Sequence, residues 1–374
     1  MGIEFIDLKA QQKRIKPALD AAIAKVLADG RYIMGPEVKE FESRLADYGE
    51  AQFAIGCANG TDALILPMMA WEIQRGAAVF CPSFTYCATA EAVAIVGATP
   101  VFVDINRDTY NMDPESLNRA ISAVKAEGNF EPRAIIAVDL FGQSADYDAI
   151  ARIAREHDLK LISDSAQGFG TTLHGKHPLA WCDVTTTSFF PAKPLGCYGD
   201  GGAILTNDEQ TSAIIESIRV HGKGKDKYDN VRIGLNSRLD TLQAAILLAK
   251  LGVFKDEIEK RNVIAKRYVA GLRGHASRLP AVLKGCVSTW AQFTIEVPDH
   301  MKFAAALKEN GVPTARYYPK PVHMQTAYKR YPCSPDGLPN TTDCIDNIIS
   351  LPIHPYLATD TQDMIIETAL KALK

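Results

Sequence analysis

The sequence predicts an α/β fold with a mostly parallel central sheet in a large domain, followed by a smaller C-terminal α+β domain. Two observations lead to this fold class. Short apolar runs alternate with helical patterns through the first two-thirds of the 374 residues, and three of the runs end at an aspartate. Such alternation is typical of parallel sheets that are covered by helices.

The expected strands and helices follow one another in order along the chain. Apolar runs predict strands at 78–80, 101–103, 134–138 and 159–162, and helical spacing predicts helices at 88–96, 114–124 and 147–157. The last three strands lead to Asp104, Asp139 and Asp164. Ligands of such sheets gather beyond the carboxyl ends of the strands, so all three aspartates are candidates and position alone does not choose among them.

A change of pattern marks the second domain. One long helix is expected from 238 to 271, followed by a strand at 290–297 and helices at 301–310 and 361–373. We therefore expect a large domain at residues 1–248 and a small domain at 249–374, joined by the long helix.

Composition excludes several classes of protein. With 47% hydrophobic residues and a net charge of −3, the chain is neither disordered nor typical of nucleic-acid-binding proteins. No apolar run approaches the ~20 residues that span a bilayer, and the N-terminus lacks the layout of a secretion signal. The spacing of the eight cysteines resembles no zinc framework. We expect a cytoplasmic protein with reduced cysteines, no metal, no membrane partner and no nucleic-acid partner.

A first candidate site is Asn59-Gly60-Thr61-Asp62, which precedes an apolar helical run. Gly60 and Thr61 would present free backbone N–H groups at a helix N-terminus, which is a phosphate-binding arrangement. An ordinary helix cap explains the same residues, and this segment alone favours the cap.

A second candidate is Ser163-Asp164-Ser165-Ala166-Gln167, directly after an expected strand. A carboxylate there can keep a heteroaromatic nitrogen protonated, and Gln167 can bond a ring substituent. A cap or loop role for Asp164 is an equal alternative on this segment alone.

A third candidate is Lys193, which lies between an apolar strand and a glycine-rich turn, whereas lysines normally occupy solvated faces. The turn loosely resembles a dinucleotide-binding fingerprint. It leads into a strand-like run at 203–206 rather than a helix, so the sequence argues against a nicotinamide oxidoreductase.

A basic loop at 219–238 is the fourth signal. It holds six cations against two anions, and it is either a solvated loop or a surface that attracts anionic substrates. The cations are Arg219, Lys223, Lys225, Lys227, Arg232 and Arg238.

Together these segments resemble the sugar aminotransferases of the DegT/DnrJ/EryC1/StrS family, which are fold-type I enzymes that use pyridoxal 5′-phosphate. The resemblance covers nearly the whole chain. It runs through Gly35-Pro36-Glu37-Val38, Cys81-Pro82-Ser83-Phe84-Thr85-Tyr86, the segment from 97 to 104, the lysine segment and Asn236-Ser237-Arg238.

The resemblance implies a role for each matching residue. Lys193 takes the place of the family's Schiff-base lysine, Asp164 pairs with the pyridine nitrogen, and Gln167 meets the phenolic oxygen. One departure is Ser163-Asp164-Ser165, where Glu-Asp-Ala is usual. Gly60, Thr61 and Ser188 match phosphate contacts, and Tyr86 and Ala166 match contacts on the two faces of the ring. Asn236 matches an asparagine that the neighbouring subunit supplies, which implies a homodimer with a shared site.

The resemblance also implies the substrates. Relatives with histidine at the Lys193 position are dehydratases, so a lysine favours transamination, with glutamate as the donor. The motifs resemble enzymes acting at C3 of UDP-linked 2-acetamido-3-keto sugars, in hexose or hexuronate form, for lipopolysaccharide, lipid A or surface polysaccharide synthesis. The expected sugar contacts are Arg238, Tyr317, Tyr318 and His323, with Tyr317-Tyr318 standing where the glucuronate enzymes have a His-Tyr pair.

Two alternatives remain open from the sequence. One is a C4 aminotransferase acting on a dTDP- or UDP-4-keto-6-deoxy sugar. The other, of a different class, is a regulatory protein that binds pyridoxal phosphate without turnover.

Overall fold

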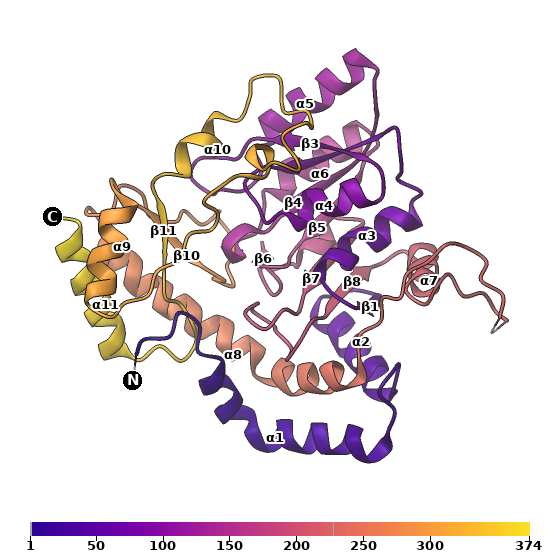
Figure 1. Cartoon of the computed structure of the whole chain (residues 1–374), viewed down its shortest axis with the longest axis horizontal. Helices are drawn as coiled ribbons and strands as arrows, with labels where there is room; N and C mark the ends of the chain where they lie inside the picture. The colour runs from indigo at the N-terminus through magenta and orange to yellow at the C-terminus, as the bar shows by residue number, and fades with distance from the viewer. Residues whose placement is uncertain (1, 227) are drawn as a thin grey trace.

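A seven-stranded sheet forms the centre of the molecule (Figure 1). The computed structural model describes residues 2–226 and 228–374, so Lys227 of the basic loop lies outside the described residues. The strand order is β1-β8-β7-β5-β4-β2-β3, and only β8 is antiparallel to its neighbours, which confirms the mostly parallel sheet. The strands are β1 Phe53–Cys57, β2 Ala77–Pro82, β3 Thr99–Val103, β4 Glu131–Val138, β5 Lys160–Asp164, β7 Val184–Ser188 and β8 Gly202–Thr206.

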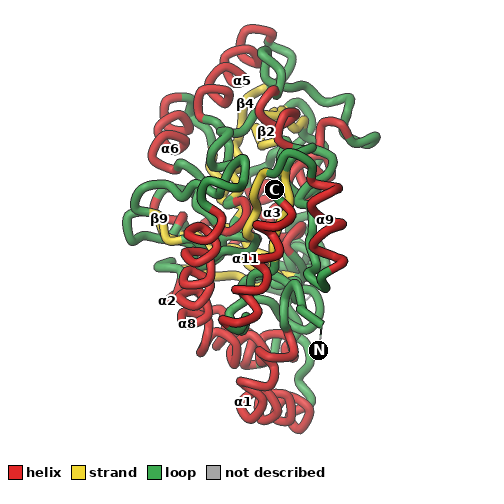
Figure 2. The backbone as a smooth tube through the Cα atoms, turned by 90° about the vertical axis from the view of Figure 1, so that its left-hand side faces the viewer, coloured by secondary structure: helices red, strands yellow, loops and turns green. Residues whose placement is uncertain are grey.

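Helices cover both faces of this sheet because successive strand residues point to opposite sides. On β2, Ala78 and Phe80 belong to the core beneath α5 (Pro114–Glu127) and α6 (Tyr147–Glu156). Val79 and Cys81 belong to the other core, beneath the remaining helices of the layer. Figure 2 shows α5 and α6 on one side of the strands. The helices of the second layer are α3 Gly60–Ala70, α4 Ala88–Ile95 and α7 Glu209–Ile218.

The helices expected at 88–96, 114–124 and 147–157 are confirmed as α4, α5 and α6. Asp113 and Asp146 cap α5 and α6 by accepting hydrogen bonds from backbone N–H groups of the first turn. Such caps satisfy donors that have no partner inside the helix, so these helices begin where the aspartates stand.

The long helix is also confirmed, as the 32-residue α8 (Thr241–Leu272), which runs above α1 in the lower half of Figure 1. Its first half packs against α1 (Leu8–Asp29) and α2 (Pro36–Tyr48), and its second half packs in the C-terminal core. The proposed domain boundary at 248/249 therefore lies inside one continuous helix.

The C-terminal region has its own hydrophobic core, around Tyr268, Phe293, Phe303 and Ile365. It confirms the strand expected at 290–297 and the helices expected at 301–310 and 361–373. Its elements are β9 Cys286–Val287, β10 Phe293–Glu296, α9 His300–Glu309, α10 Pro339–Cys344, β11 Ile348–Leu351 and α11 Thr359–Ala372. Strand β9 pairs with β6 (Thr172–Leu173). One 3₁₀ turn, Val322–Met324, also belongs to this region, and two others, Leu140–Gly142 and Pro178–Ala180, lie earlier in the chain.

Part of this region returns to the large sheet. The backbone N–H of Phe102 on β3 donates to the carbonyl of Pro332, and Asp104 accepts hydrogen bonds from the backbone and hydroxyl of Thr341. The division into 1–248 and 249–374 stays a proposal, since residues after 249 cover the β3 edge of the large sheet.

All eight cysteines are unpaired thiols. Within the described residues, no helix combines the length and apolar character that a membrane crossing requires, and no cluster of side chains is arranged to hold a metal ion.

Candidate active site

The carboxyl ends of the parallel strands bring the predicted residues to one edge of the sheet. Asp164 is the last residue of β5, and Ser188 is the last residue of β7. Tyr86 follows β2, and Gly60 begins α3 just after β1, which runs parallel to β7 because both are antiparallel to β8. The chain thus gathers a carboxylate, a hydroxyl, an aromatic ring and a helix N-terminus at one place.

The structure distinguishes the three aspartates that the sequence left equal. Asp104 is bound by Thr341, as described above, and Asp139 is enclosed by hydroxyl and backbone donors. Asp164 alone is an electrostatic partner of Lys193. This interaction with a lysine distinguishes Asp164 from Asp104 and Asp139, whose contacts hold the fold together.

Asp164 is held firmly in place. Its side chain is only 6% exposed, and it accepts hydrogen bonds from the Thr89 hydroxyl at 2.9 Å and from the Ala166 N–H at 3.2 Å. Burial raises the pKa of Asp164, and these two hydrogen bonds and the Lys193 charge oppose that rise. A cation placed against this carboxylate would therefore be strongly favoured.

Lys193 lies in the turn between β7 and β8, partly buried. Burial lowers its pKa, and the charge of Asp164 opposes the change. A lower pKa increases the fraction of neutral amine, which is the nucleophilic and basic form. The arrangement suits a lysine that forms a covalent bond to a carbonyl compound and exchanges protons.

The first turn of α3 is the predicted phosphate site. Asn59 caps the helix by accepting from the Asp62 N–H at 2.8 Å, which confirms the cap reading. A Cβ at Gly60 would lie 2.6 Å from Cβ of Ser188, so only glycine allows this approach. Since the first N–H groups of a helix lack partners inside it, Gly60, Thr61 and Ser188 form a donor set that fits a phosphate.

Gln167 connects this edge to the C-terminal region. Its Nε2 donates to the Tyr318 hydroxyl at 2.8 Å, and its Oε1 accepts from the Phe141 N–H at 2.8 Å. The ring of Tyr86, 56% exposed, lies with its centroid 6.1 Å from that of Tyr318. Tyr318 thus contacts both the buried amide of Gln167 and the ring of Tyr86.

Comparison with known proteins agrees with this geometry. Residues 13–370 match the DegT/DnrJ/EryC1/StrS aminotransferase family. The chain belongs to this family. The resemblance expected from the sequence is thereby confirmed, together with the fold class and the enzyme class, so this chain is an aminotransferase.

Three relatives illustrate the likeness. The UDP-2-acetamido-2-deoxy-3-oxo-D-glucuronate aminotransferase of Pseudomonas aeruginosa is 47% identical over 96% of each chain. A DegT/DnrJ/EryC1/StrS aminotransferase structure from Brucella abortus is 51% identical, with a TM-score of 0.97 over 98% of each chain. The structure of NtdA from Bacillus subtilis, solved with the bound cofactor PMP, is 29% identical with a TM-score of 0.90, covering 100% of this chain and 85% of NtdA.

The departure at Ser163 and Ser165 of this aminotransferase has a structural reason. Both hydroxyls donate to the buried Asp139, and the Tyr147 hydroxyl contacts Asp139 at 2.9 Å and Ser163 at 2.7 Å. The two serines therefore bind a buried carboxylate behind Asp164. Sequence reasoning missed this network and also Thr89, because no local spacing links these residues.

Asn236 precedes Ser237, whose hydroxyl accepts a hydrogen bond from the Ala58 N–H at 3.3 Å. Asn236 itself is exposed, and its backbone forms a bridge with Val220 at the base of the loop after α7. Figure 1 shows this loop projecting beyond the body of the molecule. Arg238, two residues further on, is partly exposed. Their roles stay predictions.

His323 and Tyr317 occupy the C-terminal side of the site. The Nδ1 atom of the His323 ring lies 2.6 Å from the hydroxyl oxygen of Ser83. The backbone N–H of His323 donates to the same hydroxyl at 3.1 Å. Burial lowers the pKa of His323. Tyr317 packs edge-on against Tyr318, with ring centroids 5.7 Å apart. The contacts of His323 indicate an anchoring role, and its predicted sugar contact is untested.

Proposed function

We propose that this aminotransferase uses pyridoxal 5′-phosphate to move the amino group of glutamate to C3 of a UDP-linked 2-acetamido-3-keto hexose or hexuronate. The observation that carries the proposal is the electrostatic interaction between the Lys193 amine and the buried carboxylate of Asp164. The 47% identity to a UDP-3-keto-glucuronate aminotransferase supports the sugar and the position of the amino group.

The chain's own residues fit this cofactor. Gly60, Thr61 and Ser188 form the phosphate cradle described above, and the aromatic ring of Tyr86 and the small Ala166 would contact the two faces of a flat ring. When bound, pyridoxal phosphate supplies an electron sink for the carbon that carries the amino group.

Each polar residue has a distinct task in this proposal. The neutral amine of Lys193 removes the proton from the donor's α-carbon, which its lowered pKa favours. The carboxylate of Asp164 keeps the ring nitrogen protonated, and the Thr89 hydroxyl orients that carboxylate. Gln167 donates to the phenolic oxygen from the amide that Tyr318 holds in place.

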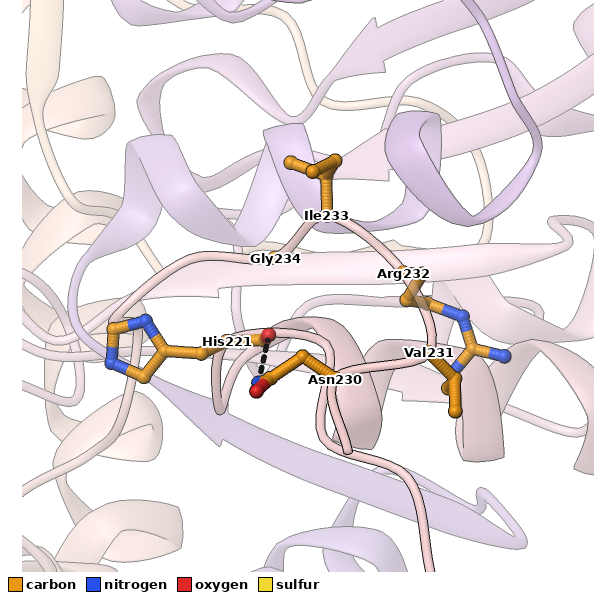
Figure 3. A pocket seen from close by; sticks show the side chains of 6 residues that line it. All are labelled: His221, Asn230, Val231, Arg232, Ile233 and Gly234. Carbon is orange, nitrogen blue, oxygen red and sulfur yellow. Dashed lines mark hydrogen bonds between the residues drawn. The ribbon is translucent and has the colours of Figure 1, made fainter. Parts of the chain in front are cut away.

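A second copy of the chain completes the site in our proposal. The loop after α7 presents exposed apolar side chains, Val231 and Ile233, the latter 87% exposed. Around them an open cavity of about 760 Å³ is lined by the residues of Figure 3. Exposed apolar side chains on a projecting loop favour burial against another chain. In a homodimer of this kind, Asn236 would reach the phosphate of the partner.

The sugar is proposed to lie between Tyr317, Tyr318 and Arg238. A guanidinium suits either a hexuronate carboxylate or the diphosphate of the nucleotide. Tyr317 stands where the glucuronate enzymes are expected to have a histidine. The proposal therefore includes both a hexose and a hexuronate substrate. His323 would contribute only if its bond to Ser83 opened.

We place this reaction in the cytoplasm, in the synthesis of lipopolysaccharide, lipid A or surface polysaccharide. This placement rests on the nucleotide-linked substrate proposed above and on the absence of an apolar spanning helix among the described residues.

A substrate panel tests the proposal. Purified enzyme with glutamate is offered UDP- and dTDP-linked 3-keto and 4-keto sugars, with and without a C6 carboxylate, and amino-sugar formation is measured by mass spectrometry. We expect the highest kcat/KM for a UDP-2-acetamido-3-keto sugar. A clear preference for 4-keto sugars, or no turnover of any sugar by enzyme that binds cofactor, would overturn it. The Lys193→Ala variant is the matched inactive control.

A further inference from the structure

A small cleft lined by Lys193 contains two buried side chains, each with a polar atom that has no hydrogen-bond partner among the described residues. The cleft lies between the N-terminal segment, α8, the Lys193 turn and the segment after β11. Arg261 on α8 is 7% exposed, and its Nε and Nη1 atoms have no hydrogen-bond partner among the described residues. His354 is 4% exposed, and its Nδ1 is likewise unpartnered in the described part of the chain.

The other polar side chains around this cleft are already engaged. Asp7 caps α1 by accepting from the Ala10 N–H at 2.9 Å. Gln11 donates to both oxygens of Glu257, at 3.1 and 2.9 Å, and the Tyr356 hydroxyl donates to Glu257 as well. Glu257, one turn before Arg261 on α8, is therefore turned to other donors. Glu257 still interacts electrostatically with Arg261, but the Nε and Nη1 groups of Arg261 have no hydrogen-bond acceptor among the described residues.

Buried guanidinium N–H groups without an acceptor are costly, so an anionic oxygen is the expected occupant of the space that they face. Guanidinium groups bind carboxylates well because their planar donors match the two oxygens. Burial lowers the pKa of His354 to about 4, so its ring is neutral near pH 7, and a hydrogen bond with the Glu4 backbone holds the ring in place. The pair thus offers the charge of Arg261 and a neutral, fixed ring beside it.

The size of the cleft selects among anions. The part of the cleft that can hold a water-sized group has a volume of about 10 Å³, which is about the space of one such group. The empty space of the cleft, including its open mouth, is about 280 Å³. A nucleotide sugar cannot enter such a space, whereas one oxygen of a carboxylate can. Lys193 and Pro191 line the same cleft, so a group held there lies beside the reacting lysine.

We infer that Arg261 and His354 form a subsite for a carboxylate of the amino donor and of the 2-oxo acid that it becomes. This inference rests on the proposed function, because an amino-acid donor is the carboxylate that transamination brings to Lys193. The nucleotide sugar, in contrast, does not use Arg261.

Half-reactions of the holoenzyme separate the two substrates. We compare wild type, Arg261→Gln and the control Arg267→Gln, which removes an arginine of the same helix that is paired with Asp363. Binding of 2-oxoglutarate is measured by calorimetry, and the reactions with glutamate and with the nucleotide amino sugar are followed by absorbance. For Arg261→Gln we expect roughly 10- to 100-fold weaker 2-oxoglutarate binding and a similarly raised half-saturating glutamate concentration. The control, and the amino-sugar half-reaction of Arg261→Gln, should stay within about twofold of wild type.

Three outcomes would overturn the inference. The first is unchanged 2-oxoglutarate binding in Arg261→Gln, which means that the cleft holds only water. The second is an equal loss of both half-reactions with a lowered melting temperature, which means a structural role. The third is a wild type that binds neither glutamate nor 2-oxoglutarate. Failure of the sugar assignment is distinguishable, because the glutamate half-reaction requires no sugar. If Arg261→Gln does not fold, Arg261→Lys, which keeps the charge and loses the planar fork, gives the same comparison.

Discussion

The side-chain amide of Gln167 donates a 2.8 Å hydrogen bond to the hydroxyl of Tyr318, 151 residues further along the chain. The bond joins the segment after β5 to the segment that follows α9, so it ties the edge of the large sheet to the C-terminal region. The same amide is the group that we propose for the phenolic oxygen of the cofactor. Tyr318 thereby fixes the orientation of a cofactor ligand.

Replacing Tyr318 with phenylalanine should release this amide. We expect the free energy of unfolding of Tyr318→Phe to fall by about 1 kcal/mol, the usual net contribution of one hydrogen bond. The visible absorption maximum of the holoenzyme should also shift, because Gln167 is no longer held toward the ring oxygen. Urea unfolding and absorption spectra check both effects, with Tyr317→Phe as the control. An unchanged spectrum would show that Gln167 does not contact the cofactor.

Lys193→Ala should bind pyridoxal phosphate but show neither the visible band of the lysine-linked cofactor nor turnover. The phosphate cradle at Gly60 does not involve Lys193, so binding of the cofactor is retained. Absorption spectra and phosphate-ester content measure the two properties, and the exposed Lys255→Ala serves as the control. Full turnover by Lys193→Ala would refute the assignment of the catalytic lysine.

Asp164→Asn should keep the fold and lose most of the rate, on the order of 10²-fold or more in kcat. The amide can still accept from the Ala166 N–H, and the Thr89 hydroxyl can turn to accept from the new NH₂ group, since Thr85 lies 3.0 Å away as an alternative partner. The ring nitrogen, in contrast, loses its negative partner. Melting temperature and steady-state rates are compared with wild type. A variant with a normal melting temperature and a normal rate contradicts the role of Asp164.

Subunit mixing tests the shared site. If Asn236 reaches the partner's phosphate, Lys193→Ala and Asn236→Ala damage different halves of one composite site. Heterodimers of the two variants then carry one doubly damaged site and one intact site, so activity should return to about half of the wild-type rate per heterodimer if the sites act independently. The test requires Asn236→Ala alone to be impaired, which a lost hydrogen bond to a charged group, about 1.5–3 kcal/mol, predicts. Exchange that is proved by mass without recovered activity would assign Asn236 to its own subunit.

Asp139 predicts a pH dependence of stability. Burial raises the pKa of this carboxyl to about 6, against about 3.9 in the unfolded chain. Between these values the folded state binds more protons than the unfolded state, so its stability falls as pH rises, by up to about 3 kcal/mol for two pKa units. Below pH 4 both states are protonated, and above pH 6 the loss is complete.

Urea unfolding of wild type and Asp139→Asn between pH 3.5 and 7.5 measures this effect. The stability advantage of wild type over the variant should shrink between pH 4 and 6. Asp208→Asn is the opposite control, because the hydrogen bonds from Thr211 lower the pKa of Asp208 and its contribution is lost as pH falls. A difference between wild type and Asp139→Asn that does not change with pH would mean that the pKa of Asp139 is the same in the folded and unfolded states.

Much of the fold was predictable because it depends on local patterns. The runs that became β2, β3, β4 and β5 alternate with helices whose apolar spacing and aspartate caps lie within a few residues of each other. Asp164, Gln167 and Lys193 were predictable for a related reason, since each belongs to a short segment that resembles the family's motif. Helices α1 and α2 were not anticipated, and neither was the return of the C-terminal segment to β3.

Local periodicity and short motifs encode the order of the elements from β2 to α6, the sheet type, the family and the candidate site residues, so these could be deduced from the sequence. Tertiary packing settles which of the three strand-end aspartates interacts electrostatically with Lys193, and it shows why Ser163 and Ser165 accompany Asp164. It also leaves the buried Nε and Nη1 groups of Arg261 without a hydrogen-bond acceptor among the described residues. These facts depend on side chains far apart in the chain, whose contacts arise only when the helices and the sheet pack together.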